Sequence, residues 1–162
     1  MLMKSPAEQL IAALDSSDCD TLKALINESF PPDYTDDFGL NLLHAATASI
    51  GLEPTCDVLD VLLDAGVDIN GVDDNGWPPI FFAVRSNFAA AVRHLAEHGA
   101  ALDIVGKDQM SCLHLAAWNP FKADMVKTLV GYGARLCTEN SKAFVRALPL
   151  DKRDLFETGD AT

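Results

Sequence analysis

The sequence predicts an all-α fold, a solenoid of about four helix–turn–helix units joined by short hairpin-like turns. Two observations predict this class. Three glycines, Gly66, Gly99 and Gly133, each follow an amphipathic run, and they lie 33 and 34 residues apart. The polar turns DDFG, DDNG and GKDQ each precede a short apolar run and recur after 37 and 33 residues. A single unit of this length cannot bury both of its helices, whereas stacked units share a continuous core.

The composition is that of a globular domain. The chain has 162 residues, of which 49% are apolar and 22% are charged, enough for one hydrophobic core. The start, MLMKSPAEQLIAAL, contains no long apolar run, so we expect neither a signal sequence nor a membrane span, and a cytoplasmic protein. We expect one domain over residues 1–150, with units at about 5–35, 36–72, 73–105 and 106–139 and a closing helix at about 140–148. The sequence leaves open whether the tail, residues 151–162, is ordered.

The first unit, SPAEQLIAAL followed by TLKALI, fits the repeat in length but lacks the terminal glycine. Ser5 is a suitable N-cap, Pro6 suits the first helical position, and Glu8 completes a capping box. We therefore expect this unit to cap the N-terminal end of the array.

The second unit pairs LLHAATA with VLDVLLDA and ends at Gly66. Between them, TASIGLEPTCD is four residues longer than the corresponding segment of the third unit. We expect it to form a protruding loop on the far side of the array from the turns. It is either a tolerated insertion, which we favour because surface insertions cost little, or a second contact.

The third and fourth units continue the pattern with AVRHLAEH before Gly99 and CLHLAAW in the last short helix. The segment NSKAFVRALPLDKRDLFE can supply a closing helix. Turns are expected near residues 33–40, 70–77 and 103–110. The apolar stripes predict that the following residues are buried: Leu43, Ala46, Leu62, Leu63, Ala83, Leu95, Leu113, Ala116 and Leu129.

These units resemble ankyrin repeats over about residues 5–140. The matching segments are DDFGLNLLHAAT with AGVDIN, DDNGWPPIFFAV with HGAALD, and GKDQMSCLHLAA with YGARLC. The array departs from the family pattern where Asn41-Leu42 and Ser111-Cys112 replace a Thr-Pro pair, and where Phe81 replaces a histidine. The resemblance implies that His44 and His114 are structural, with each imidazole bonded to backbone between neighbouring repeats.

The resemblance also implies that the protein binds other proteins through its turn tips and the exposed side of its inner helices. Carried over by position, the tip residues are Asp36, Asp37, Phe38, Leu40, Asp73, Asp74, Asn75, Trp77, Lys107, Asp108 and Met110. The inner-helix residues are Ala48, Ser49, Arg85, Ser86, Trp118 and Asn119. Acids beside large apolar side chains suit an interface. The alternative is that apolar residues such as Trp77 and Leu40 fold down and pad the hairpins.

The charge is strongly acidic and uneven. The formal net charge is −12, and residues 1–84 alone carry −13. Such a surface disfavours nucleic acid and anionic membranes and favours a basic protein partner. An array capped at both ends is expected to be a monomer without its partner.

Three functions remain open. We favour a non-catalytic module that binds and inhibits a basic protein, for instance an immunity protein or antitoxin that neutralises a toxin or effector enzyme. The alternative is an adaptor or assembly subunit with several partners.

The least favoured function is a zinc hydrolase that uses HLAEH, in which His94, Glu97 and His98 match a zinc-protease pattern. That function needs a third ligand and a cleft for substrate, and the outer helix of a solenoid offers no such cleft. The motif is therefore interpreted as structural. The sequence predicts no catalytic residue, no cofactor and no metal.

The cysteines, Cys19, Cys56, Cys112 and Cys137, lie far apart without a C-x-x-C pair. We expect them to be small buried residues with free thiols.

Overall fold

The computed structural model describes residues 5–48, 52–118, 120 and 122–156, and all regular secondary structure in these residues is helical. No strand occurs in these residues, as expected for an all-α solenoid. The elements are α1 Pro6–Ser16, α2 Cys19–Glu28, α3 Leu42–Thr47, α4 Cys56–Asp64, α5 Pro79–Ser86, α6 Ala89–Glu97, α7 Cys112–Ala117, α8 Ala123–Gly131, α9 Glu139–Ala147, α10 Leu150–Arg153 and the 3-10 turn η1 Asp154–Phe156.

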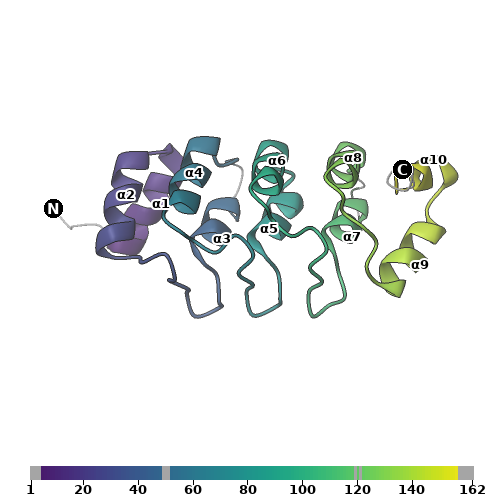
Figure 1. Cartoon of the computed structure of the whole chain (residues 1–162), viewed down its shortest axis with the longest axis horizontal. Helices are drawn as coiled ribbons and strands as arrows, with labels where there is room; N and C mark the ends of the chain where they lie inside the picture. Colours follow the sequence, from purple (N-terminus) through teal and green to yellow (C-terminus); the bar gives the residue numbers. More distant parts are fainter. Residues whose placement is uncertain (1–4, 49–51, 119, 121, 157–162) are drawn as a thin grey trace.

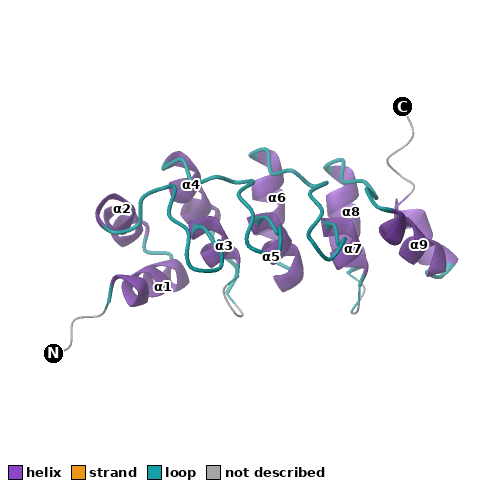
Figure 2. Ribbon diagram, turned by 90° about the horizontal axis from the view of Figure 1, so that it is seen from below, coloured by secondary structure: helices purple, strands orange, loops and turns teal. Residues whose placement is uncertain are grey.

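The helices pack as successive antiparallel pairs in two layers (Figure 1). The inner helices α3, α5 and α7 contact one another in order, and the outer helices α2, α4, α6 and α8 form the second layer. Three hairpins project side by side from the inner layer, and the view turned by 90° shows the same two rows of helices (Figure 2). The array is therefore an elongated stack whose units touch mainly their neighbours.

Local sequence signals set the helix ends as expected. Ser5 and Glu8 form the predicted capping box at the start of α1, with Pro6 in its first turn. Gly66, Gly99 and Gly133 follow the outer helices with φ of +90°, +89° and +89°, a conformation that a Cβ would strain. These three glycines end the outer helices at the same point in each unit.

The core is one continuous cluster of apolar side chains between the two layers. Of the nine residues predicted to be buried, eight are at most 1% exposed. Leu63 is the exception, because it is only partly buried at the edge of the cluster. It follows the fully buried Leu62 and lies on the flank of the α4 stripe.

The insertion in the second unit is not simply a protruding loop. Residues 49–51 lie outside the described residues, but Pro54 is buried. The Glu53 carboxylate accepts hydrogen bonds from the backbone N–H groups of Ala90 and Ala91, at 2.7 and 3.1 Å. The N-cap of α6, Phe88, provides no side-chain hydrogen bond of its own. Part of the insertion therefore caps the outer helix of the next unit.

A second contact between units lies between α7 and α8. The Lys122 ammonium donates to the carbonyl oxygens of Val84 and Arg85, both at 2.8 Å, at the end of α5. Partial burial lowers the pKa of Lys122. A cation at this position adds hydrogen bonds to the last carbonyl groups of α5, where the helix dipole favours positive charge.

The C-terminal segment is ordered further than the sequence could establish. After α9, the chain forms α10 and then η1, which packs against α8. Leu155 and Phe156 pack against the main core. Residues 150–156 thus cover the end of the array, and residues 157–162 lie outside the described residues.

The expectation for the cysteines was only partly right. Cys112 is buried and Cys19 is partly buried, but Cys56 and Cys137 are exposed, and all four are free thiols. Cys56 is the first residue of α4 and lies outside its buried stripe.

Candidate partner-binding surface

The hairpin tips form a connected row, defined here as residues 36–40, 73–77 and 106–110. The Asp74 N–H donates to the Phe38 carbonyl at 3.0 Å, and the Lys107 N–H donates to the Asn75 carbonyl at 2.8 Å. The Lys107 ammonium also donates to the carbonyl oxygen of Asp74. These bonds fix each tip relative to the next, so the tip row presents its side chains in a defined arrangement.

Each tip turns through a residue with positive φ. Gly39, Gly76 and Gln109 occupy this position with φ of +77°, +80° and +64°. In all three tips the N–H of this residue donates to the backbone carbonyl oxygen three residues earlier, and this hydrogen bond closes the turn. The predicted equivalence of Gln109 to the two glycines is confirmed.

Two of the predicted tip carboxylates hold the hairpins together. Asp36 accepts from the N–H groups of Phe38 and Leu40, both at 2.9 Å. Asp73 accepts from those of Asn75 at 2.9 Å and Trp77 at 2.8 Å. The expectation that Asp73 projects from its tip is wrong, because it is only 7% exposed. A carboxylate at this turn position serves the local backbone first.

The remaining polar tip residues are exposed. On the first tip, the exposed Asp37 is the sequence neighbour of Phe38, a residue that is 68% exposed. The others are Asp74, Asn75, Lys107, Asp108 and Gln109. Asp108 also accepts from the Met110 N–H at 3.0 Å. An exposed ring beside exposed carboxylates is the feature of this surface most suited to a partner.

Trp77 mainly covers its neighbours. Its ring stacks on Phe81 with the centroids 4.8 Å apart, and its indole N–H donates to the Asp108 carboxylate at 3.4 Å. A Cβ added at Gly106 would come within 2.4 Å of the indole, so the glycine makes room for the ring. Leu40 and Met110, the equivalent residues of the other tips, are also partly buried against the core. These residues pad the hairpins, as the alternative interpretation proposed.

The predicted inner-helix residues differ in how exposed they are. Arg85 is exposed, and its guanidinium lies 4.7 Å from the centroid of the Phe82 ring and 5.9 Å from that of Trp77. Ala48 and Ser86 are partly buried. Ser49 and Asn119 lie outside the described residues. The third unit therefore presents a cation over aromatic faces, in contrast to the acidic tips.

A second aromatic cluster lies at the C-terminal end. Trp118 is 52% exposed and stacks on Phe144 of α9 with centroids 5.5 Å apart. Phe144 in turn stacks on His114 at 4.8 Å. Sequence analysis did not identify Phe144, because the closing helix has no counterpart in the repeat pattern. This cluster is a second exposed apolar surface.

The two histidines of the repeat motif differ. The Nε2–H of His44 donates to the Trp77 carbonyl at 2.9 Å, which links neighbouring units as predicted. Within the described residues, the His114 imidazole does not bond to backbone; its Nδ1 lies 3.4 Å from the Ser141 hydroxyl, and its buried Nε2 has no hydrogen-bond partner there. After the fourth unit, α9 takes the place of the next hairpin. Burial lowers the pKa of both imidazoles.

The geometry supports neither a nucleophilic role for Cys112 nor the zinc hydrolase that HLAEH suggests. Burial raises the pKa of the Cys112 thiol to about 12, so this thiol is protonated at neutral pH and poorly suited to be a nucleophile. Glu97, the residue that would act as general base in HLAEH, accepts a hydrogen bond from the Tyr132 hydroxyl at 2.6 Å. It is therefore engaged with α8.

Within the described residues, no helix is long and apolar enough to cross a membrane.

Comparison with known proteins identifies the repeats. A family profile described as ankyrin repeats in three copies matches residues 47–140. The RelA-associated inhibitor of Mus musculus is 28% identical over 98 residues, which are 60% of this chain and 11% of that protein. SH3 and multiple ankyrin repeat domains protein 2 of Homo sapiens is 32% identical over 96 residues, 59% of this chain and 5% of that protein.

A further relative carries the name of an enzyme. A palmitoyltransferase of Lachancea kluyveri is 30% identical over 112 residues, which are 68% of this chain and 15% of that protein. The matched region thus spans only a small part of each of these relatives.

Proposed function

The chain belongs to the ankyrin repeat family, and from this premise we propose that it inhibits a basic protein by binding it through the tip row. Ankyrin repeats are modules for protein–protein interaction and are typically non-catalytic. Binding alone is therefore the starting point.

The observation that carries the proposal is the exposed Phe38 ring beside exposed carboxylates. Asp37 is its neighbour in the sequence, and Asp74 lies on the adjoining tip, whose backbone bonds to Phe38. An apolar ring can be desolvated by a partner while the surrounding carboxylates attract cationic side chains. Residues 1–84, with a charge of −13, extend this attraction over half of the array.

Inhibition requires no chemistry beyond occupancy of the partner. Carboxylates held in a fixed row can imitate an anionic substrate and cover a basic active-site cleft. Neutralisation of a toxin or effector enzyme in the cytoplasm, by an immunity protein or antitoxin, is a role of this kind. One relative carries the word inhibitor in its name, and this supports inhibition as an activity of proteins with such repeats.

An adaptor is the second candidate, because the surface has two separate aromatic sites. Phe38 lies on the first tip, whereas the cluster of Trp118 and Phe144 lies toward the other end of the array, just after α7 and on α9. Two sites in different parts of the array could bind two proteins at the same time.

Affinity capture from the source cell distinguishes these functions. The full chain is used as bait beside two variants, Phe38→Ser and Trp118→Ser, which each remove one exposed aromatic side chain. Recovery of a single basic enzyme at a one-to-one ratio, lost with Phe38→Ser and inactive in the complex, supports inhibition. Different proteins lost with each variant support an adaptor. An acidic partner, or one retained by both variants, contradicts the proposed surface.

A further inference from the structure

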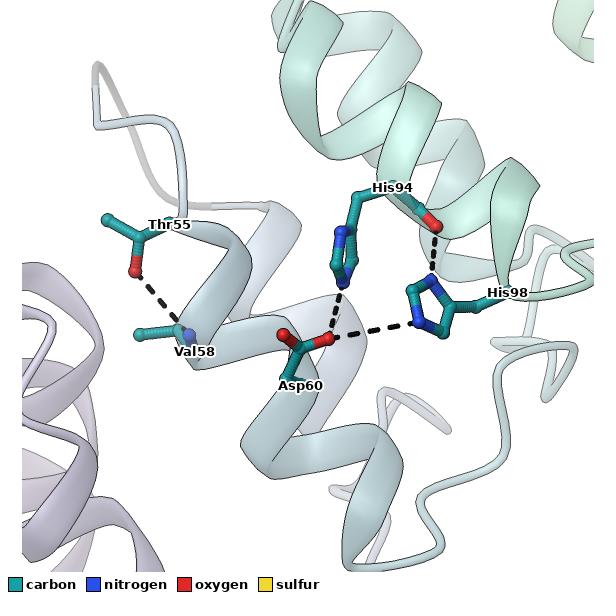
Figure 3. A network of polar contacts seen from close by, with 5 residues as sticks. All are labelled: Thr55, Val58, Asp60, His94 and His98. Atoms are coloured by element: carbon teal, nitrogen blue, oxygen red, sulfur yellow. Dashed lines mark hydrogen bonds and ion pairs between the residues drawn. The ribbon is translucent and has the colours of Figure 1, made fainter.

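Three potential metal ligands converge on the outer layer, away from the tip row. His94 and His98 lie one turn apart at the C-terminal end of α6, and Asp60 projects toward them from α4 (Figure 3). The Asp60 carboxylate lies 2.7 Å from Nε2 of His94 and 3.9 Å from Nε2 of His98. One ligand atom from each residue falls within 4.8 Å of the other two.

Local hydrogen bonding prepares His98 to coordinate. Its Nδ1 lies 2.8 Å from the carbonyl oxygen of His94, and because a carbonyl only accepts, Nδ1 carries the proton. In the neutral ring, Nε2 then has a free lone pair, and it is this atom that faces Asp60. Imidazole ligands of metals are commonly oriented by a hydrogen bond from the other ring nitrogen in this way.

We propose that Asp60, His94 and His98 bind a divalent transition-metal ion such as Zn²⁺, which links the second and third units. Two imidazoles and one carboxylate suit zinc or nickel and are a poor match for calcium or magnesium, which prefer oxygen ligands. Three protein ligands leave the remaining coordination to water.

The present separations require only small movements. Bonds of about 2.0–2.2 Å place neighbouring ligand atoms roughly 3 Å apart around a metal. The side chains of Asp60 and His98 are 46% and 45% exposed, so both can rotate toward such positions. The side chain of His94 is only 12% exposed, which holds it in place as the fixed member of the set.

The proposed role is structural. Glu97, which a hydrolase would need beside the metal, bonds to Tyr132 instead. A metal between α4 and α6 would join two outer helices whose units otherwise meet through packing and hydrogen bonds. Without metal, Asp60 and His94 already form a hydrogen bond between units, and the experiment must separate these two roles.

Titration of the full chain with Zn²⁺ alone distinguishes metal binding from the metal-free contact between units. Calorimetry measures binding, and thermal melting measures stability. We expect one ion per chain and a rise in melting temperature. The variants Asp60→Asn and His98→Gln should each weaken binding by at least about tenfold and abolish that rise. The matched control is Asp64→Asn, which removes an equal charge one turn along α4 and should bind as the parent does. Circular dichroism checks that each variant is folded.

Zn²⁺ bound by the exposed thiols of Cys56 and Cys137 would be a competing explanation for any binding that is observed. The double variant Cys56→Ser, Cys137→Ser should retain full Zn²⁺ binding if the site is the one proposed. Loss of binding in this variant would overturn the proposal. So would equal binding by Asp60→Asn, His98→Gln and Asp64→Asn, or no saturable binding by the parent chain.

Discussion

At the scale of single residues, two adjacent carboxylates of the second tip have different roles. Asp73 is buried and accepts hydrogen bonds from two backbone N–H groups, whereas Asp74 is exposed. Sequence alone treats the pair as equivalent acids of a turn. The structure assigns hairpin stability to Asp73 and leaves Asp74 as the carboxylate that a partner can reach.

This difference predicts different costs of truncation. Asp73→Ala should lower the free energy of unfolding by about 1–3 kcal/mol, because it leaves N–H groups of the tip without their charged acceptor. Asp74→Ala should change it by no more than about 0.5 kcal/mol. Urea unfolding of both variants makes the comparison, and equal costs would contradict the assigned roles.

His44 predicts a pH dependence of stability. Burial lowers the pKa of this imidazole in the folded state, and its Nε2–H donates to the Trp77 carbonyl. The unfolded chain therefore takes up the proton at a higher pH than the folded chain. The stability from neutral His44 is present above the unfolded pKa of about 6.5 and is lost as the pH falls below it.

Urea unfolding at about pH 7.5 and about pH 5.5 tests this dependence. The parent chain should be less stable at the lower pH, and His44→Gln should lose part of that difference. An unchanged difference in His44→Gln would show that other groups cause the pH dependence.

At the scale of elements, the helix ends show what sequence can and cannot predict. The capping box at Ser5 and the glycine stop at Gly66 depend on neighbouring residues, so the sequence predicts both. The contacts made by Glu53 and Lys122 join residues 37 or 38 positions apart. They follow from the stacking of units, and no local pattern reveals them.

The cap provided by Glu53 predicts that the insertion contributes to stability. Glu53→Ala should cost about 1 kcal/mol, the typical value for removal of an N-cap, and Glu53→Gln should cost less because it keeps an acceptor. Thermal or urea unfolding measures both. If Glu53→Ala leaves stability unchanged, the segment around it is only a tolerated insertion.

The candidate site shows the same limit. The positions of the tips could be predicted, because the repeat period places each turn. The directions of Trp77 and Asp73 could not, since they depend on the neighbouring hairpin and on backbone hydrogen bonding. The convergence of Asp60 with His94 likewise required the packing of α4 against α6.

At the scale of the whole molecule, the array combines a fixed row of hairpin tips with an uneven distribution of charge. Hydrogen bonds between tips hold Phe38 and Asp74 in one arrangement, and most of the negative charge lies in the same half of the chain. A partner that approaches this half experiences the negative electrostatic field before it contacts the Phe38 ring. Charge should therefore govern the association rate, and the Phe38 contact should govern dissociation.

The most direct test of the central claim is the association rate of the captured partner over a salt series from about 50 mM to about 500 mM. The tip variant Asp37→Asn, Asp74→Asn is compared with Asp57→Asn, Asp64→Asn, which removes the same charge from exposed positions on the outer helix α4. We expect the tip variant to associate about two- to tenfold more slowly at low salt and with a flatter salt dependence. The α4 variant should stay close to the parent chain. Equal rates for both variants and the parent would contradict the claim that the tip row receives a basic partner.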